Sequence, residues 1–326
     1  MHRRTFLALL GSAAVARPLP VRAQPRDGKW RIAFLGAPAA SKYAKLIDAL
    51  RAGLRDFGYV EGENIAMEFR WADGNNQRLP ELAAQLANLR PDVLVTHGTP
   101  GTSAAKQATT TIPIVMAVSG DAVDTGLINS LARPGGNVTG TTFFGPELAA
   151  KRLELFCEAV PKARQLAVLV NPANAVNAPV LQAMQKTATS LKIELEQIAI
   201  RKSAELENAF AQIAAQKFDG VAVFEDGITV ANAATIAQLG VNERLPLTGF
   251  VEIAKAGGLI GYGANIPALF RRAGYFVDRI LRGQKPADIP VEQPTKFDLV
   301  INTRTAKALG YPIPPTLLAA ADELVE

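Results

Sequence analysis

A strand-and-helix order occurs twice along this chain of 326 residues, and it leaves few folds open. Short apolar strands starting at positions 32, 65 and 93 are matched by strands starting at 166, 193 and 221, an offset of about 130 residues. Apolar residues at helical spacing fill the intervals; the first such period runs from Tyr43 to Phe57 and ends at Gly58, a residue that favours helix termination. The paired segments differ in sequence, so the repeat is one of topology, and it predicts two similar lobes.

The apolar patterns of the strands predict their places in each sheet. In both halves the second strand alternates apolar with polar residues, as at 65–71, whereas the first and third strands are continuously apolar. A strand with one polar face suits the edge of a parallel sheet, and continuously apolar strands suit its interior. The order 2-1-3-4-5 satisfies both conditions. We therefore predict an α/β fold of two doubly wound, Rossmann-like lobes joined by a hinge, with a ligand cleft between them.

The last part of the chain is too short for a third domain. Strand patterns at 259–262 and 297–301 flank a helical period at 269–280. We expect these elements to complete the two lobes rather than to form a separate domain. The chain is then expected to cross between the lobes near residues 141, 258 and 290. Lobe one would hold 24–141 plus 259–289, and lobe two would hold 142–258 plus 290–326.

Residues 1–23 have the layout of a secretory signal peptide. Arg3 and Arg4 precede an apolar run, and small residues near its end suit cleavage after Ala23. The paired arginines also fit the twin-arginine export motif, so the twin-arginine and general secretory (Sec) routes both stay open. No later run approaches the length of a membrane span, and no cysteine near Ala23 offers a lipid anchor. We expect an exported, unanchored protein of the periplasm.

Charge and cysteine content exclude several classes of protein. The chain carries 35 Lys and Arg against 30 Asp and Glu, but residues 1–23 hold four of the arginines and no acid. The remainder is close to neutral, and aromatic residues make up only 6%, so a nucleic acid is not an expected partner. Cys157 is the only cysteine, which rules out an intrachain disulfide, and its apolar helical neighbours predict a buried core position.

Polar residues follow the predicted strands at the edge where parallel α/β sheets bind ligands. After the third strand, free N–H groups at a helix start and the hydroxyls of Thr99, Thr102 and Ser103 could take a carboxylate; a simple N-cap by Thr102 or Ser103 is the alternative. Glu225 and Asp226, at the matching place in the second half, could take an ammonium group or could be solvated loop acids. Tyr262 could stack on a ligand or pack in the hinge. The predicted ligand-binding residues are Gly36, Thr99, Thr102, Ser103, Ser119, Asp121, Asn171, Glu225, Asp226 and Tyr262.

The common motifs of catalytic and metal sites are missing from the sequence. It has no G-x-S-x-G, no G-x-x-x-x-G-K-[ST] and no G-x-G-x-x-G after the first strand. Ser103–Lys106 matches S-x-x-K, but the other motifs of serine β-lactamases are absent. His97 is the only histidine after residue 23, so a histidine metal site is excluded, and His97 is expected to line the cleft or cap a strand. We predict no enzyme activity, no cofactor and no metal; an exported α/β enzyme is an alternative.

Seven segments, in order along the chain, match motifs of one known family: Ile112–Val115, Arg133–Gly140, Lys151–Leu155, Gly257–Gly263, Lys285–Pro294, Lys296–Asn302 and Thr305–Gly310. The chain resembles the substrate-binding proteins of ABC transporters, in the family that includes tryptophan- and phenylalanine-binding members and has the type I periplasmic binding-protein fold. The match covers nearly all of the chain after the signal peptide. One departure is Asp121–Val123, which reads Asp-Ala-Val where the family has Asp-Pro-Val.

The resemblance implies a receptor for a small-molecule solute that closes its lobes on the ligand and delivers it to a membrane permease. An ATPase on the cytoplasmic side of the inner membrane would drive that permease. The expected ligand is a small carboxylate-bearing solute such as an amino acid, and the receptor is expected to be a monomer. A ligand sensor that signals through a membrane partner would share this sequence and remains an alternative.

Overall fold

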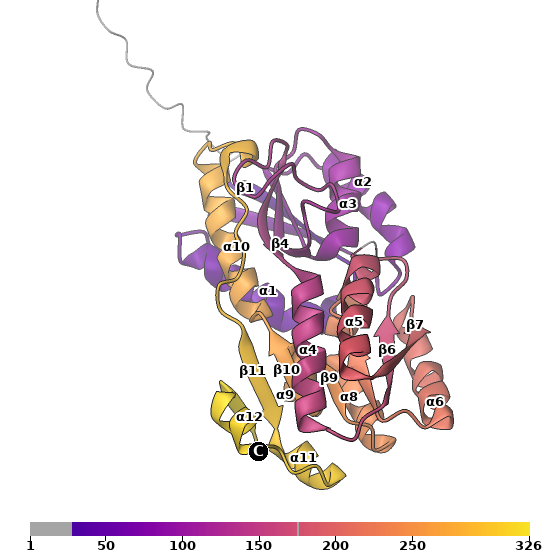
Figure 1. Cartoon of the computed structure of the whole chain (residues 1–326). Coiled ribbons are helices and arrows are strands. Elements are labelled where there is room, and N and C mark those ends of the chain that lie inside the picture. Colours follow the sequence, from indigo (N-terminus) through magenta and orange to yellow (C-terminus); the bar gives the residue numbers. More distant parts are fainter. Residues whose placement is uncertain (1–27, 175) are drawn as a thin grey trace, which may run out of the picture.

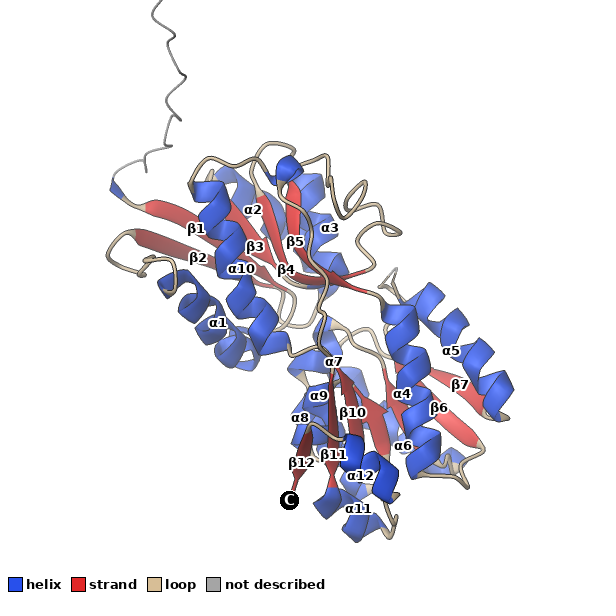
Figure 2. Cartoon of the chain, turned by 60° about the vertical axis from the view of Figure 1, so that its left-hand side comes forward, coloured by secondary structure: helices blue, strands red, loops and turns tan. Residues whose placement is uncertain are grey.

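The computed structural model describes residues 28–174 and 176–326. The predicted signal peptide, its cleavage site and the export route concern residues outside this part of the chain. The described residues form two α/β lobes, each built on a sheet of its own (Figures 1 and 2). The predicted fold class, two doubly wound lobes, is confirmed.

The first lobe contains a five-stranded parallel sheet in the order β2-β1-β3-β4-β5. The predicted order 2-1-3-4-5 is therefore confirmed, and β2 is the half-exposed edge strand that its alternating pattern predicted. The strands are β1 (Trp30–Gly36), β2 (Ile65–Trp71), β3 (Val93–Thr96), β4 (Ile114–Gly120) and β5 (Val138–Phe143), and the helices between them are α1 (Ala40–Arg55), α2 (Leu79–Asn88) and α3 (Gly98–Ala108).

The second lobe contains a seven-stranded sheet in the order β12-β11-β10-β9-β8-β6-β7. Counted from β6, its first five strands repeat the order of the first lobe, and β11 then adds antiparallel to β10. The strands are β6 (Gln165–Val170), β7 (Glu194–Ala199), β8 (Gly220–Val223), β9 (Leu247–Gly249), β10 (Ile260–Gly263), β11 (Asp298–Asn302) and β12 (Glu323–Val325). The later helices are α4 (Gly145–Ala159), α5 (Asn177–Leu191), α6 (Leu206–Gln216), α7 (Gly227–Ala231), α8 (Ala233–Asn242), α9 (Val251–Ala256), α10 (Ile266–Leu281), α11 (Thr303–Leu309) and α12 (Pro315–Ala320).

Helices cover both faces of each sheet, which explains the continuously apolar central strands. In β1, Ile32 and Phe34 belong to the core under α1 and α10, while Ala33 and Leu35 belong to the core under α2 and α3. The second sheet packs against α4 and α5 on one face and against α6 and α8 on the other. Successive side chains of a strand alternate between faces, so each central strand must be apolar throughout.

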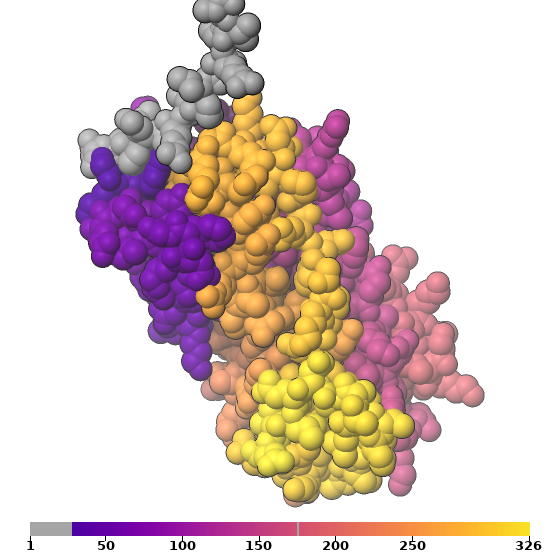
Figure 3. Space-filling model, turned by 90° about the vertical axis from the view of Figure 1, so that its left-hand side faces the viewer, coloured from indigo at the N-terminus to yellow at the C-terminus, as the bar shows by residue number. Residues whose placement is uncertain are grey.

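The chain passes between the lobes three times, as predicted, but the passages lie later than expected. The first passage follows β5 at residue 144, and the second follows β10 at residues 264–265. The third lies at residues 293–297, after the bridge between Thr141 and Glu292. The prediction assigned the strand at 259–262 to lobe one; that assignment is wrong, because β10 pairs with β9 and β11 in the second sheet. Figure 3 shows the consequence: the orange segment around α10 lies on the upper lobe, and the yellow C-terminal residues cover the lower one.

The two lobes touch each other beyond these connections. Residues Val230 and Ala231 of α7, in the second lobe, pack against the α1 and α10 side of the first lobe. A Cβ built on Gly227 would lie 3.6 Å from the Cβ of Ala37, and one built on Gly74 would lie 3.1 Å from the Ser203 hydroxyl. These contacts bring the carboxyl ends of the two sheets face to face, as the predicted cleft requires.

Candidate functional site

A pocket lies between the lobes where the two sheets face each other, and we call it the cleft pocket. It encloses about 350 Å³ of space, part of it open to solvent. Its polar wall in lobe one comes from the ends of β3 and β4, and its wall in lobe two comes from the end of β8 and the start of α7. The lining residues are His97, Gly98, Thr99, Val118, Ser119, Gly120, Phe143, Asn174, Val176, Glu225, Asp226, Gly227 and Val230.

The lobe-one wall presents hydrogen-bond donors. The hydroxyl groups of Thr99 and Ser119 lie 3.0 Å apart, and the Thr99 hydroxyl also lies 3.3 Å from the carbonyl of Gly120. Helix α3 begins at Gly98 after a non-helical His97, and no side chain caps it. The first N–H groups of a helix lack partners within the helix and carry partial positive charge. This wall therefore suits an anionic group.

The predicted N-cap of α3 at Thr102 or Ser103 is wrong, because the helix begins four residues earlier than Thr102. Gly98, Pro100 and Gly101 are residue types typical of loops, but proline is also common in the first turn of a helix. The buried Thr102 hydroxyl donates to the carbonyl of Gly98 at 2.9 Å, and neither Thr102 nor Ser103 lines the cleft pocket. The lobe-one wall of the cleft pocket therefore begins directly after β3.

The lobe-two wall is dominated by the carboxylate of Asp226, which is only 5% exposed. One oxygen accepts the N–H of Ile228 at 2.8 Å and so caps α7; the other accepts the side-chain amide groups of Asn174 at 2.8 Å and Asn171 at 3.4 Å. Burial raises the pKa of Asp226, and these three hydrogen bonds oppose that rise. All its hydrogen-bond partners are neutral, so no positive charge among them offsets the desolvation of this carboxyl group.

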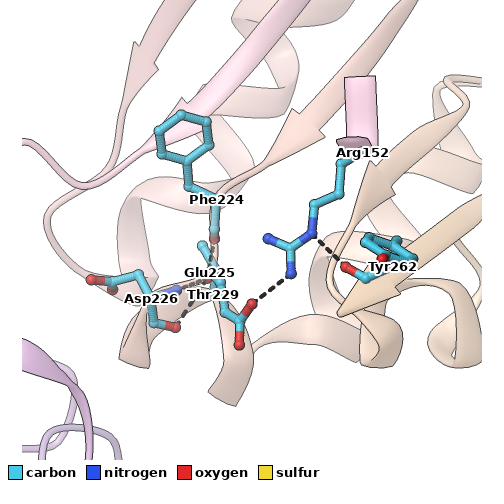
Figure 4. Close-up of polar contacts among 6 residues, drawn as sticks. All are labelled: Arg152, Phe224, Glu225, Asp226, Thr229 and Tyr262. Carbon is cyan, nitrogen blue, oxygen red and sulfur yellow. Dashed lines mark hydrogen bonds and ion pairs between the residues drawn. The ribbon is translucent and has the colours of Figure 1, made fainter. Parts of the chain in front are cut away.

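Glu225, by contrast, is already paired. Its carboxylate lies 2.6 Å from the guanidinium of Arg152, and both side chains are more than nine-tenths buried. Arg152 also donates to the carbonyl of Tyr262 at 2.6 Å, so it joins α4 to the ends of β8 and β10 (Figure 4). Glu225 was one of the two acids predicted to take an ammonium group, but in the structure the Arg152 guanidinium is its cationic partner.

Arg152 was not among the site residues predicted from the sequence, although its position on its helix was a signal. Arg152 occupies the face of α4 that also carries Leu148, Phe156 and Ala159, all of which are buried. A lone charged residue on an apolar helix face indicates a buried partner, because an unpaired buried charge is too unstable to persist. Its partner, Glu225, lies 73 residues later, and no local pattern links the two.

A second hollow, which we call the deep chamber, adjoins the cleft pocket and encloses about 420 Å³, part of it open to solvent. The two share Phe143, Val176 and Glu225 as lining residues. The walls of the deep chamber are mostly apolar and come from α4, α5 and β8, and Arg152 is its positively charged lining residue. A ligand with a polar head in the cleft pocket could therefore place an apolar group in the deep chamber. Its remaining lining residues are Gly145, Ala149, Asn177, Val180, Met184, Ala222, Val223, Phe224, Thr248 and Gly249.

Of the ten predicted ligand-binding residues, Thr99, Ser119, Glu225 and Asp226 line the cleft pocket. Asn171 lies behind it and orients Asp226. Gly36 ends β1 under the ring of Trp71, whose atoms would lie 2.2 Å from any added Cβ. Tyr262 packs against both lobe cores with its ring centroid 6.0 Å from that of Phe297, as its hinge-packing alternative predicted.

Asp121 lies at the first passage between the lobes and outside the cleft pocket. Its backbone has a positive φ of 37°, and its carboxylate accepts the N–H of Gly145 at the start of α4 at 3.3 Å. Burial raises the pKa of Asp121 to about 6. In this chain Asp121 therefore ties the end of β4 to the first turn of α4.

Two further titratable groups of lobe two have shifted pKa values. Burial, followed by the nearby charge of Glu225, raises the pKa of Glu252 to about 7, and one of its carboxylate oxygens is buried without a hydrogen-bond partner. Cys157 is half-buried rather than fully buried as predicted, and burial raises its pKa to about 11. A thiol with a raised pKa is a poor nucleophile. Among the described residues no cluster of three or more His, Cys, Asp or Glu side chains could hold a metal ion.

The helices within 28–174 and 176–326 include none with the length and apolarity needed to cross a bilayer.

Comparison with known proteins gives matches over most of the chain. A curated relative, the tyrosine-binding protein of Clostridioides difficile, is 29% identical over 257 residues, which span 78% of this chain and 74% of the relative. A solved structure of a conserved domain protein from Vibrio cholerae is 28% identical, covers 91% of this chain and 99% of its own, and has a TM-score of 0.83. A structure from Streptococcus pneumoniae in complex with L-Trp is 23% identical, covers 91% of this chain and all of its own, and has a TM-score of 0.82.

The model of one family matches residues 33–325, which include nearly all of both sheets, the cleft pocket and all three passages between the lobes. That family is described as ABC transporter substrate binding protein. The chain belongs to the substrate-binding protein family of ABC transporters.

Proposed function

We propose that this chain is the exported receptor of an ABC importer and that it binds a free amino acid with an apolar, aromatic side chain. The observation that carries the proposal is the pairing of two unlike walls across one pocket. The start of α3 offers N–H donors to a carboxylate, beside the hydrogen-bonded pair of Thr99 and Ser119 hydroxyls. Across the cleft, Asp226 holds a carboxylate whose neighbours are neutral and suits an ammonium group.

The deep chamber supports an aromatic side chain. Its apolar walls adjoin the cleft pocket through Phe143 and Val176, beside the place where the polar groups of a ligand would lie. Burial of an aromatic ring adds a large apolar contribution to affinity. The names of two similar proteins agree with this class, since one is called tyrosine-binding and another was solved with L-Trp.

The decisive experiment is a thermal-shift and calorimetry series with L-tyrosine, L-tryptophan, L-phenylalanine, L-glutamate and benzoate. At a hundred times its dissociation constant a ligand stabilises the native state by about 2.7 kcal/mol, enough for a clear shift of the midpoint. At least one aromatic amino acid should bind more tightly than L-glutamate. If benzoate binds and every amino acid fails, the ammonium assignment to Asp226 is wrong.

Replacement of Asp226 tests the ammonium site directly. Asp226→Asn keeps the size of the side chain but removes its charge, so it should weaken an amino acid by about 1.5–3 kcal/mol, the value of a charge-assisted hydrogen bond. Binding of benzoate, which has no amine, should change little. The matched control is Glu207→Gln, a substitution at the acidic residue in the first turn of α6, outside the residues that line either hollow. Equal losses for the amino acid and benzoate would contradict the assignment.

The cellular part of the proposal follows from the family. Receptors of ABC importers deliver their ligand to a membrane permease, so we expect the chain in the periplasmic fraction and co-purifying with a permease and its ATPase. Fractionation by osmotic shock, followed by crosslinking and pull-down, tests both points. Recovery of a membrane kinase in place of a permease would favour the sensor alternative.

A further inference from the structure

We propose that His97 contacts the ligand carboxylate through its Nε2–H, as a neutral donor whose tautomer Tyr43 fixes from behind the pocket. The inference rests on the proposed function, because it names a further specificity-determining residue of the same site. From the sequence alone, His97 was expected either to line the cleft or to cap a strand. In the structure it precedes α3 and lines the cleft pocket beside Gly98 and Thr99.

The tautomer follows from the hydrogen bond between the Tyr43 hydroxyl and Nδ1 of His97. Tyr43 is fully buried in lobe one. Among the described residues, its hydroxyl hydrogen-bonds only to Nδ1 of His97. Burial and the charge of Asp226 raise the pKa of Tyr43 well above its ordinary value, so the phenol keeps its proton. Because this hydroxyl has no other acceptor among the described residues, it donates the proton to Nδ1 of His97. A neutral imidazole that accepts at Nδ1 carries its own proton on Nε2.

Aromatic neighbours hold the imidazole ring in place. Its centroid lies 5.5 Å from that of Tyr43 and 5.3 Å from that of Phe270. Tyr43 in turn packs edge-on against Phe270 and Trp71, with centroid distances of 5.9 Å to each. These rings come from α1, β2 and α10 of the lobe-one core. Desolvation in this setting lowers the pKa of His97 to about 4, so the ring is neutral at ordinary pH.

The remaining nitrogen, Nε2, is available to a ligand. Only 7% of the surface of His97 is exposed, and the residue lines the cleft pocket. The described residues provide no hydrogen-bond partner for Nε2. A donor held there would act together with the first backbone N–H groups of α3 on one carboxylate. The titratable groups around it are Tyr43 from α1 and, across the cleft, Glu225 and Asp226.

The tautomer can be tested without a ligand. We would record long-range ¹H–¹⁵N spectra of the ¹⁵N-labelled chain and identify the His97 signals as those lost in His97→Gln. At pH 7 we expect a protonated Nε2, an unprotonated Nδ1 and no titration between pH 8 and pH 5. Tyr43→Phe removes the donor to Nδ1 and should yield a mixture of tautomers. A proton on Nδ1, or titration near the ordinary value of about 6.5, would overturn the inference.

The contact with the ligand is tested by adding L-tyrosine, and then tyramine, which lacks the carboxylate. L-tyrosine should shift the Nε2 proton resonance and tyramine should not. His97→Ala should weaken L-tyrosine by roughly 10- to 150-fold, the range for a hydrogen bond to a charged group, while Gln107→Ala on the exposed face of α3 should leave it unchanged. Tyr43→Phe should cost less than His97→Ala, because its effect passes through the histidine.

The outcomes separate this inference from the proposed function. If L-tyrosine binds with equal affinity to the wild-type chain and to His97→Ala, the inference is wrong and the amino-acid receptor stands. If L-tyrosine, L-tryptophan and L-phenylalanine all fail to bind, the proposed ligand class fails, and the tautomer and pKa of His97 decide the inference by themselves.

Discussion

At the scale of single residues, Arg152 shows how a buried charge can hold a lobe together. Its guanidinium contacts Glu225 and the carbonyl of Tyr262, and Gly263 leaves room for it, since an added Cβ there would lie 2.7 Å from Nη2. Removal of one partner of a buried ion pair leaves an uncompensated charge, whereas replacement of both partners by apolar residues is often neutral. The value of the pair is therefore visible only through paired variants.

Arg152→Met should destabilise the protein by about 3–5 kcal/mol in denaturant unfolding at pH 7, because Glu225 is left buried and unpaired. The double variant Arg152→Met, Glu225→Met should recover most of that loss, because no charge then remains. Lys151→Met, at the exposed neighbouring position, is the matched control and should change stability little. A single Arg152 variant as stable as the wild type would mean that Glu225 finds another partner or solvent.

At the scale of elements, the contact between α1 and α10 fixes how the late part of the chain returns to lobe one. The two helices meet at Gly53 and Gly274, where backbone lies on backbone. A Cβ on Gly274 would lie 2.3 Å from the carbonyl carbon of Gly53, and a Cβ on Gly53 would lie 1.9 Å from the carbonyl oxygen of Arg271. Only glycine at both positions permits this approach.

Gly274→Ala should therefore destabilise the protein, although alanine favours a helix over glycine by about 1 kcal/mol. Overpacking costs about 1–3 kcal/mol, and here the obstacle is backbone, which cannot rotate away. The measurement is the free energy of unfolding in denaturant. Gly136→Ala, where an added Cβ meets nothing within 4 Å, is the control and should change stability by less than about 0.5 kcal/mol. A stabilised Gly274→Ala would show that the helices can separate freely.

The strand order of the first sheet and the edge position of β7 in the second were predictable from sequence, whereas the sheet to which β10 belongs was not. Continuous or alternating hydrophobicity records how many faces of a strand are covered, and this places β2 and β7 at sheet edges. The pattern of β10, however, is the same whichever sheet covers it. Its pairing with β9 places β10 in the second sheet, and the local sequence of a strand does not identify its pairing partner.

At the scale of the whole molecule, the distance between the lobes is what ligand exchange must change. Ala37 directly follows β1 of lobe one, and Gly227 is the first residue of α7 in lobe two. Their Cβ positions lie 3.6 Å apart, within the range of about 3.5–4.5 Å found in disulfides. The hinge consists of three passages of the chain, so separation of the lobes would part these two residues without unfolding either sheet.

The double variant Ala37→Cys, Gly227→Cys should form an intramolecular disulfide on oxidation, detected as loss of two free thiols and faster migration on a non-reducing gel. Cys157 should not interfere, because burial raises its pKa to about 11 and keeps it as a thiol. The oxidised protein, locked shut without ligand, should no longer take up an amino acid, and reduction should restore binding. Each single variant is a control. Failure to crosslink would show that the lobes lie apart in solution.

The sequence by itself determined the two-lobed α/β fold, the strand order of the first sheet and the sheet edge at which the cleft pocket lies, because hydrophobic patterns and turn residues are local features that repeat with the structure. Four of the ten predicted ligand-binding residues line the cleft pocket on that basis. The tertiary structure alone decided which polar groups are free. It paired Glu225 with Arg152, left Asp226 among neutral donors, placed the start of α3 at Gly98, and set Tyr43 behind His97. Such pairings join residues tens of positions apart, and only the packed chain brings them within bonding distance.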